Sequence, residues 1–490
     1  MADDNNKTIV LYPSPGRSHL VPMIELGKLI LTHHPSFSIT MIVPTFPNTV
    51  AGDTSHYIFA VSGITFHHLP TVSDELGLKY YPSIDEVTRL RDRLAELNNP
   101  NLRQTLLTLF KTSTLKALVI DFFCKAALQV SSSLNIPTYF FFTSGATALA
   151  QILHYPNLKN ITDNDCFRVD AESEMLLDHI PGLPPIRAKE MFPPDDSVLK
   201  NTIDTAIQMT KSCGIIINTF ETLEQRASQA LKDGKCVPNG ETMPPVYCLG
   251  PVLAATVDNK NDYHMCLSWL DLQPKQSVVF LCFGSMVFFS SKQLKEMAIG
   301  LERSRVRFLW VVRVPPPEDE FRRNLAVADA EVSVEMFLPE DFLERTRDRG
   351  LVVKSWAPQT DVLSHDSVGG FVTHCGWNSV IEALCAGVPM VAWPFIGDQM
   401  VNRSFLVEDI EVAVPVVESE DGLVYGAELE KRVIELMDSE NGKGKVLRER
   451  TRALKEKAMG ALREGGCSLA ALAELATRLD KEWSTDDYEF

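Results

Sequence analysis

One stretch, residues 356–399, constrains the fold of this chain more than any other part. It holds two short apolar segments, 369–375 and 389–393, and each is followed by a turn and the start of a helix, near Asn378 and near Gln399. Strands that lead through a turn into a helix are typical of a parallel sheet, whose binding sites lie at the carboxyl ends of the strands. The stretch therefore predicts an α/β domain with a site at this edge.

The rest of the chain repeats this alternation of strands and helices, which predicts doubly wound parallel sheets. At 490 residues the chain is too long for one hydrophobic core, so we expect two such domains. We place the first domain at 1–245, a linker at 246–262, the second domain at 263–466 and an amphipathic C-terminal helix within 467–490. The segment 155–197 is polar and rich in proline, and we expect an irregular excursion there.

Composition limits the partners and the compartment. The net charge of −17 argues against nucleic acids and anionic membranes as partners, and the 45% hydrophobic content is that of a soluble globular protein. The ten cysteines form no CxxC pair, which favours free thiols in a reducing compartment. We see no signal-peptide pattern and no apolar run of about 18 residues. We therefore expect a cytoplasmic protein without a membrane span, and nothing demands more than a monomer.

The stretch 356–399 contains no Lys or Arg, yet it has the features of an anion site. Gly376, Asn378 and Ser379 lie where a helix begins, so free backbone N–H groups and the helix dipole can face a phosphate. His374 adds a ring N–H donor. An acidic protein could bind an anionic nucleotide in this way, with local dipoles instead of cationic side chains.

The same stretch offers partners for the other parts of a nucleotide sugar. Trp356 has a flat face on which a base can stack, and Glu382 suits a pair of ribose hydroxyls. Asp398 and Gln399 can bind further hydroxyls. A second candidate phosphate turn, at the end of the strand predicted at 277–285, is formed by Gly284 and Ser285.

In this order the residues resemble the signature box of plant UDP-sugar-dependent glycosyltransferases that act on small secondary metabolites. The matching motifs are WAPQ, HCGWNS, the Glu of IEAL, GVPMVAWP and the final DQ. The similarity extends through nearly the whole chain and is nearest to phenylpropanoid and flavonoid glucosyltransferases. It implies a GT-B fold, with two Rossmann-like domains facing a cleft, UDP-glucose as co-substrate, no metal, and a last helix that returns to the first domain. It assigns UDP-sugar binding within the box to Trp356, Ala357, Gln359, His374, Gly376, Trp377, Asn378, Ser379, Glu382, Asp398 and Gln399.

A His–Asp pair is the candidate for activating an acceptor. His19 follows the turn after the first predicted strand, and Asp121 ends another strand, so both belong at the same sheet edge. A carboxylate fixes the tautomer of an imidazole and stabilises the imidazolium, and a phenol with a pKa near ~10 is within reach of such a base. The resemblance implies that His19 is the catalytic base, that Asp121 is its partner, and that Thr143 contacts the primary hydroxyl of the sugar.

Two departures from the family pattern bear on specificity. Arg17 and Ser18 precede His19 where the family usually has a glycine-rich turn, and Arg17 either points outward or lines the acceptor side. The box ends in FIGDQ instead of a Tyr-Ala-Glu-Gln type of ending, which predicts a less polar and roomier wall near the reacting carbon. A Gly-Asp-Gln ending occurs both in relatives that form C-glycosides and in relatives that form O-glycosides.

One further motif has a metal-binding form. Residues 163–165 read DND, a literal DxD, which binds a metal and a diphosphate in a different class of glycosyltransferase. The motif lies in a polar loop with no strand before it, so we interpret it as a solvated turn and expect no metal site. The chain has no GxGxxG, Walker A or GxSxG motif.

These observations predict an inverting UDP-glucose-dependent glucosyltransferase that forms an O-glucoside of a flavonoid or related phenol. One alternative is a C-glucosyltransferase that uses the same base and attaches glucose to a ring carbon. A transferase for a terpenoid or hormone is another, since the acceptor residues lie in the variable first half. A third alternative is a nucleotide-sugar-binding protein without catalysis, against which the intact His19 and Asp121 argue. Gln399 favours glucose as the sugar.

Overall fold

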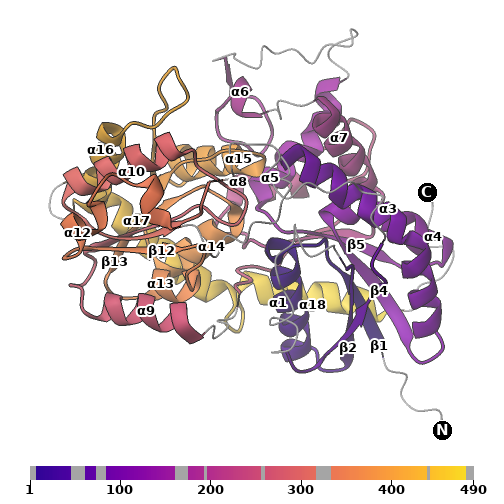
Figure 1. Cartoon of the computed structure of the whole chain (residues 1–490). Helices are drawn as coiled ribbons and strands as arrows, with labels where there is room; N and C mark the ends of the chain where they lie inside the picture. Colours follow the sequence, from indigo (N-terminus) through magenta and orange to yellow (C-terminus); the bar gives the residue numbers. More distant parts are fainter. Residues whose placement is uncertain are drawn as a thin grey trace. The chain divides into compact units, whose positions relative to one another are not determined.

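The structure, a computed structural model, describes residues 7–45, 61–72, 84–159, 175–191, 196–254, 260–315, 333–438 and 442–481. By internal contacts the chain divides into two compact units, one of residues 1–255 with 460–490 and the other of residues 256–459. Each unit contains one large parallel sheet whose strands are connected through helices (Figure 1). The predicted doubly wound α/β class is therefore confirmed.

The first unit is built on a seven-stranded sheet in the order β3-β2-β1-β4-β5-β8-β9. Its central strand β1 pairs in parallel with two neighbours, so that Leu11 lies opposite Met41 in β2 and Val119 in β4. These strands are apolar and buried because helices cover both faces of such a sheet. The strands are β1 (Lys7–Tyr12), β2 (Phe37–Val43), β3 (Ile64–His68), β4 (Thr114–Asp121), β5 (Thr138–Phe142), β8 (Gly214–Ile217) and β9 (Val246–Cys248).

Helices of the first unit follow the strands closely. A short turn leads from β1 into α1, and β4 passes directly into the 3-10 turn η1 (Phe122–Cys124), against which α3 packs. A small antiparallel pair, β6 (Leu176–Leu177) and β7 (Ile186–Arg187), lies in the predicted excursion, of which residues 160–174 and 192–195 are outside the described residues. The helices are α1 (Arg17–His33), α3 (Ile84–Leu109), α4 (Ala127–Ser133), α5 (Ala146–Lys159), α6 (Ala188–Met191), α7 (Asp196–Thr210) and α8 (Gln225–Lys232).

The second unit is built on a six-stranded parallel sheet in the order β12-β11-β10-β13-β14-β15. The strands are β10 (Val278–Cys282), β11 (Arg307–Val312), β12 (Gly350–Lys354), β13 (Val368–Thr373), β14 (Met390–Ala392) and β15 (Ala413–Pro415). The helical segments are α9 (Lys260–Asp271), α10 (Ser291–Ser304), η3 (Val334–Phe337), α12 (Phe342–Thr346), α13 (Gln359–Ser364), α14 (Trp377–Ala386), α15 (Asp398–Ser404), η4 (Phe405–Asp409), α16 (Gly426–Met437) and α17 (Lys443–Ala461).

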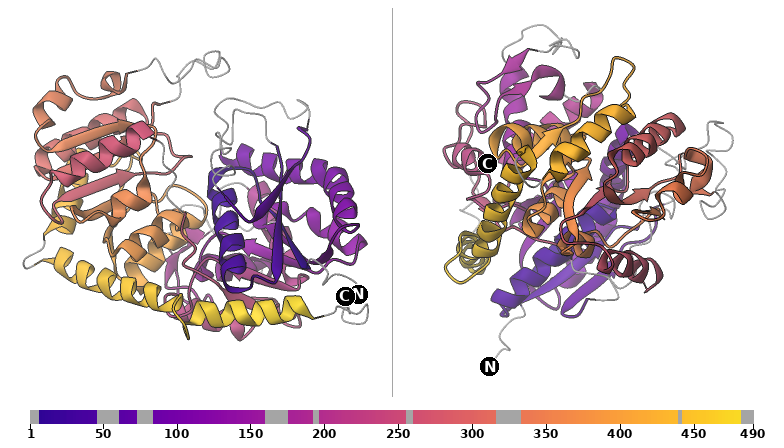
Figure 2. Two further views of the ribbon diagram at one scale, coloured as in Figure 1. Left: turned by 90° about the horizontal axis from the view of Figure 1, so that it is seen from below. Right: turned by 90° about the vertical axis from the view of Figure 1, so that its left-hand side faces the viewer.

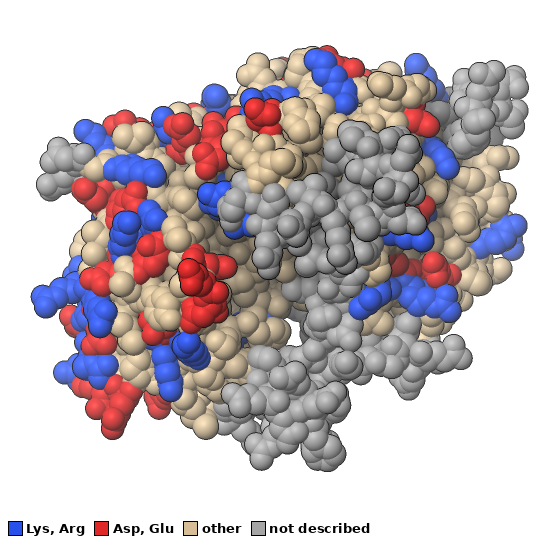
Figure 3. Space-filling model, turned by 90° about the horizontal axis from the view of Figure 1, so that it is seen from above, with Lys and Arg blue, Asp and Glu red and all other residues tan. Residues whose placement is uncertain are grey.

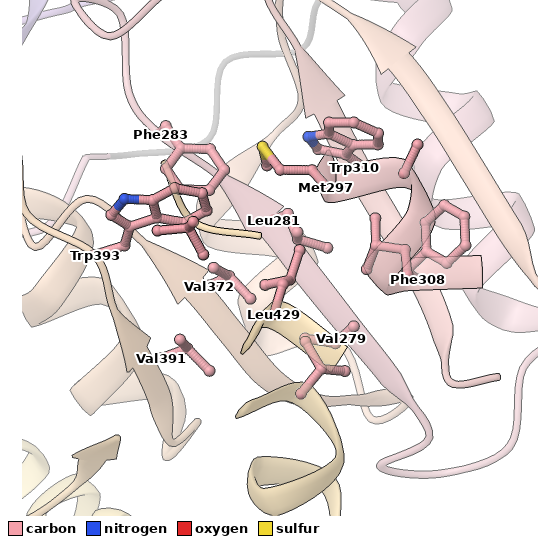
Figure 4. Packing of buried hydrophobic residues seen from close by; sticks show 14 of the residues in the cluster. Val279, Leu281, Phe283, Met297, Phe308, Trp310, Val372, Val391, Trp393 and Leu429 are labelled. Carbon is pink, nitrogen blue, oxygen red and sulfur yellow. The ribbon is translucent and has the colours of Figure 1, made fainter. Parts of the chain in front are cut away.

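One face of this second sheet carries a continuous hydrophobic core. Val279 and Leu281, two residues apart on β10, point to the same face and meet Val372 and Val391 of the next strands (Figure 4). Leu429 of α16 covers this face, because α10 and α16 pack side by side. The core continues to the carboxyl ends of the strands and so supports the turns that follow them.

The C-terminal helix α18 (Cys467–Asp480) packs against β4 and β9 of the first unit (Figure 2). At its start Ser468 Oγ donates to the carbonyl oxygen of Gly250, and at its end Lys7 Nζ donates to Asp480 Oδ1 at 2.6 Å. The segment predicted as a linker is partly regular structure, since β9 and the first residues of α9 lie within it. Sequence reasoning overlooked β9 because a three-residue strand carries no measurable alternation.

Charged side chains of both signs are interspersed on the face shown in Figure 3. Across the described ranges, no helix has the length and apolar character needed to span a bilayer.

Candidate acceptor and donor sites

His19 and Asp121 come together at the carboxyl edge of the first sheet. Strands β1 and β4 are adjacent and parallel, so the turn after β1 and the last residue of β4 lie at the same edge. His19 is in the first turn of α1, and its Nδ1 lies 2.9 Å from Asp121 Oδ2. Both side chains are buried. The structure thus brings together two residues that the sequence places at separate strand ends.

The hydrogen bonds of this pair leave one ring nitrogen available for chemistry. An ionised carboxylate can only accept, so Nδ1 of His19 donates and Nε2 keeps its lone pair. Asp121 Oδ1 accepts the backbone N–H of Phe123 at 3.0 Å, which holds the carboxylate in place. Thr143, directly after β5, places its hydroxyl 3.3 Å from the same Nδ1. This is the geometry of a general base that is oriented by a carboxylate.

An aromatic ring and an arginine adjoin the pair. The Phe123 ring meets the His19 ring edge-on at a centroid distance of 5.2 Å. Arg91 of α3 holds its Cζ 5.0 Å from the centroid of the same Phe123 ring. Sequence reasoning missed Arg91 because it lies in a charged helix without a motif, and only the packing of α3 on η1 brings it here. Arg17, which the sequence singled out, is half-buried as the first residue of α1.

In the second unit, His374 lies between two close backbone segments. A Cβ added to Gly284 would come within 2.7 Å of its Nε2, and a Cβ added to Gly376 within 2.4 Å. Both positions therefore need glycine, and Gly284 also has a φ of +70°. Burial lowers the pKa of His374 to about 4, so the ring is neutral near pH 7. Its Nδ1 has no hydrogen-bond partner among the residues that the structure describes.

Helix α14 begins beside this ring. Gly376 is the residue before its first turn, and Trp377, Asn378 and Ser379 follow, so the backbone at the helix start lies next to His374. The turn that the sequence predicts for a phosphate thus lies at the start of a helix, and its role stays a prediction. Trp377 is buried and packs on Phe405 with a ring distance of 6.1 Å, so its side chain belongs to the core.

Gln359, Ser379 and Glu382 form a hydrogen-bonded group. Gln359 Nε2 donates to Ser379 Oγ at 2.9 Å and to Glu382 Oε2 at 2.7 Å, because α13 packs against α14. The amide thus orients the carboxylate that the sequence predicts for ribose hydroxyls. Nearby in the chain, Ala357 is buried and Trp356 is half-buried, as a stacking surface requires.

Asp398 and Gln399 are held by the loop at the start of α15. The side-chain oxygen of Gln399 accepts the backbone N–H of Phe395 at 3.0 Å and of Ile396 at 3.2 Å. Asp398 Oδ2 accepts from Asn402 Nδ2 at 3.1 Å, and the same Nδ2 donates to the carbonyl oxygen of Cys375 at 3.0 Å. The sequence analysis did not identify Asn402, although its spacing of one helical turn from Asp398 indicates that the two side chains can interact.

The FIGDQ ending differs from the expected apolar wall. Phe395 packs on Trp393 at a ring distance of 5.7 Å and on Phe289 at 5.4 Å, so its ring belongs to an aromatic cluster at the edge of the core. A Cβ on Gly397 would meet nothing within 4 Å, in agreement with the expected room, but φ is +57° there. Glycine at this position therefore serves the backbone as well as the space.

A cation lies beside the turn formed by Gly284 and Ser285. Arg313, which follows β11, donates from Nη1 to the carbonyl oxygen of Ser285 and holds its Cζ 3.8 Å from the centroid of the Phe288 ring. The stretch 356–399 contains no cation, and this one comes from a different strand of the same sheet. The sequence offered no signal for it.

The DND motif at residues 163–165 is outside the described residues. Within the part of the chain that is described, no group of three or more His, Cys, Asp or Glu side chains is arranged to hold a metal ion. All nine cysteines of that part are free thiols.

Comparison with known proteins identifies the family of the chain. The family model described as UDP-glucoronosyl and UDP-glucosyl transferase matches residues 250–448. The chain is 49% identical to an anthocyanidin 5,3-O-glucosyltransferase from a Rosa hybrid cultivar, over 96% of this chain and 98% of the relative. It is 46% identical to isoflavone 7-O-glucosyltransferase 1 of Glycine max, over 96% and 98%.

Solved structures give the same result for the fold. The structure of Phytolacca americana UGT2 complexed with UDP-2-fluoro-glucose and pterostilbene superposes with a TM-score of 0.82. The two sequences are 34% identical, and the match covers 97% of this chain and 100% of the other. The likeness thus extends over both units and is not restricted to the signature stretch.

Proposed function

The chain belongs to the plant family of UDP-glycosyltransferases with the GT-B fold, and from that premise we propose that it transfers glucose from UDP-glucose to a hydroxyl of a flavonoid or related phenol. Glycosyltransferase activity follows from the family. The acceptor class is our proposal, supported by relatives named for anthocyanidin and isoflavone O-glucosylation. The proposed linkage is an O-glucoside with inversion at the anomeric carbon.

The observation that carries this proposal is the 2.9 Å hydrogen bond between His19 and Asp121. Nε2 of His19 takes the proton of the phenol, and Asp121 stabilises the resulting imidazolium. The phenol oxygen then attacks the anomeric carbon while the bond to the diphosphate breaks and UDP leaves. A single displacement of this kind inverts the carbon and needs no enzyme nucleophile.

On the donor side, we assign the diphosphate to the start of α14 and to neutral His374. The positive end of the helix dipole stabilises the negative charge that builds up on UDP, and Arg313 adds a cation beside the second turn. Glu382, oriented by Gln359, is suited to the ribose hydroxyls, and Trp356 to the base. These groups can hold a diphosphate without a bound metal.

The proposed setting is the cytoplasm, with the protein acting as a monomer. Free thiols at every described cysteine agree with a reducing compartment. The proposed site residues of the base and of the donor all come from one chain.

The test is His19→Ala, assayed with UDP-glucose and a panel of flavones, chalcones and dihydrochalcones. We expect kcat to fall by about 10²–10⁴-fold, because a positioned general base contributes that much, while the affinity for UDP measured by calorimetry stays within about twofold. His33→Ala is the matched control, since His33 is exposed in the last turn of the same helix.

The products of the native enzyme test the linkage. Acid hydrolysis should release the sugar from an O-glucoside, and fragmentation should show loss of an intact hexose. Full activity of His19→Ala would overturn the assignment of the base, and an acid-stable product with cross-ring fragments would overturn the O-linkage.

A further inference from the structure

Arg91 is a cation beside the His19–Asp121 pair that the mechanism above does not use. Its guanidinium lies over the Phe123 ring, and the edge-on contact of that ring with His19 places both groups against one aromatic side chain. Nη2 of Arg91 also lies near Gly16, where an added Cβ would be 3.3 Å away. The guanidinium therefore adjoins both the turn that leads to His19 and the turn that follows Asp121.

The buried surroundings of Arg91 disfavour its charged form. Burial lowers the pKa of its guanidinium, and the negative charge of Asp121 is the strongest of the effects that oppose this. Among the described residues, the Phe123 ring and the negative charges of nearby side chains stabilise the guanidinium. None of its five N–H groups donates a hydrogen bond to those residues. A cation held in this way is suited to an anionic group that arrives with a ligand.

We propose that Arg91 stabilises the negative oxygen of the acceptor during transfer and thereby favours phenols and other acidic hydroxyl compounds as acceptors. This inference rests on the proposed function. When the proton moves from the acceptor to Nε2 of His19, the oxygen becomes negative and the imidazole becomes positive. Asp121 stabilises the second charge and Arg91 stabilises the first. The oxygen lone pair then bonds to the anomeric carbon, and the electrons of the broken bond leave with UDP.

The other ionisable groups near Arg91 leave this role open. Burial raises the pKa of the Cys124 thiol in η1 well above its usual value, so that group is neutral near pH 7. Asp92, the neighbour of Arg91 on α3, accepts a hydrogen bond from Asn201 of α7 at 2.5 Å. Lys125 and Asp204 pair with each other at 2.8 Å in the same contact. Asp92 thus has a partner on α7 at Oδ2, while its Oδ1 has no hydrogen-bond partner among the described residues. Its charge, like that of Asp121, favours the charged form of Arg91.

Arg91→Met removes the charge and keeps the length of the side chain, and Arg91→Lys keeps the charge. Arg93→Met is the matched control, since Arg93 lies two residues away on the same helix and forms a 3.0 Å surface pair with Glu96. All variants are assayed with UDP-glucose and two acceptors, a weakly acidic phenol and a nitrophenol that is already ionised at the assay pH. Circular dichroism and thermal melting report whether the variants are folded, and UDP affinity by calorimetry shows that the other unit is unaffected.

We expect Arg91→Met to lower kcat for the weak phenol by about 10–100-fold with little change in KM, because that phenol binds neutral and ionises in the site. For the ionised nitrophenol we expect KM to rise instead, because the charge is present on binding. Arg91→Lys should recover activity to within about threefold, and Arg93→Met should behave as the native enzyme.

Native kcat for the weak phenol in Arg91→Met would overturn the role of Arg91, and so would an Arg91→Lys variant as impaired as Arg91→Met. If Arg91→Met does not fold, Arg91→Gln replaces it under the same criteria. A native enzyme that glucosylates no phenol would instead overturn the proposed function, so the two failures are distinguishable.

Discussion

The residues proposed for the acceptor, in the first unit, come from distant parts of the chain, whereas most of those proposed for the donor, in the second unit, follow one another in a single run. His19 and Asp121 are 102 residues apart and meet because β1 and β4 are neighbours. The donor group from Trp356 to Gln399 spans two strands and the helices after them. A contiguous site can be recognised in the sequence as a motif, and a dispersed one becomes visible only when the strand order is known.

The two regions also differ in their electrostatics. The proposed acceptor site contains the ionisable side chains of His19, Asp121 and Arg91, which are suited to a reaction in which a proton moves. The donor site relies on the neutral ring of His374 and on backbone N–H groups at the start of α14. The difference matches the ligands proposed for each: an acceptor whose charge changes during the reaction, and a diphosphate that is charged throughout.

The largest difference between the two sites is expected for Asp121→Asn, which should lower kcat without weakening UDP binding. The amide can no longer stabilise an imidazolium on His19, so kcat should fall by about 10²–10⁴-fold. UDP affinity, a property of the other unit, should stay unchanged by calorimetry. Asp480→Asn, which alters only a surface pair with Lys7, is the control. Equal losses in kcat and in UDP affinity would contradict the separation of the two sites.

On the donor side, the corresponding change is Gly376→Ala. The new Cβ would come within 2.4 Å of His374 Nε2, so the ring or the start of α14 must shift. We expect UDP binding to weaken by at least about tenfold, measured by calorimetry, because the N–H groups of the helix start move with the backbone. Gly460→Ala is the control, since nothing lies within 4 Å of its added Cβ and Ala favours the helix. An unchanged affinity for Gly376→Ala would refute the close packing.

Acid should destabilise the donor unit through His374. Burial lowers its pKa from 6.5 to about 4 on folding, so the folded unit favours the neutral ring. The contribution of this ring to the free energy of unfolding is therefore complete above pH 6.5 and is lost as the pH falls towards 4. The full shift corresponds to about 3 kcal/mol. Melting curves of the native protein should therefore show a larger drop between pH 6.5 and 4 than those of His374→Asn. Parallel curves for the two proteins would sink this assignment.

The smallest expected effect has the opposite sign and belongs to the acceptor unit. Burial raises the pKa of Asp92 from 3.8 to about 6. Above pH 6 the ionised carboxylate therefore lowers the free energy of unfolding, and this destabilisation disappears as the pH falls below 4. Asp92→Asn should raise the melting temperature at pH 7.5, by the equivalent of about 1–2 kcal/mol, and have little effect at pH 4. A stabilisation of the same size at both pH values would be evidence against the titration of Asp92.

Much of the fold and of the donor site could be predicted from the sequence. The parallel sheets follow from the alternation of apolar strands and helices, and the placement of His374 directly after β13 and of Gly376 at the start of α14 follows from the same local pattern. Arg313 and Arg91 could not be predicted, because each reaches its position through a neighbouring strand or through helix packing. Asn402 is an intermediate case. Its spacing from Asp398 could be recognised in the sequence, whereas its hydrogen bond to the carbonyl oxygen of Cys375 could not.

Most strands and helices, and the residues at the ends of the strands, could be predicted from the sequence, because they depend on local periodicity and on turn chemistry; the three-residue strand β9 could not. The tertiary structure alone decided that Gln359 orients Glu382, that Phe395 turns into the aromatic cluster, and that Arg91 lies beside His19. These contacts join residues from separate elements, and their energies depend on packing and burial. Neither packing nor burial can be predicted from the local pattern of the sequence.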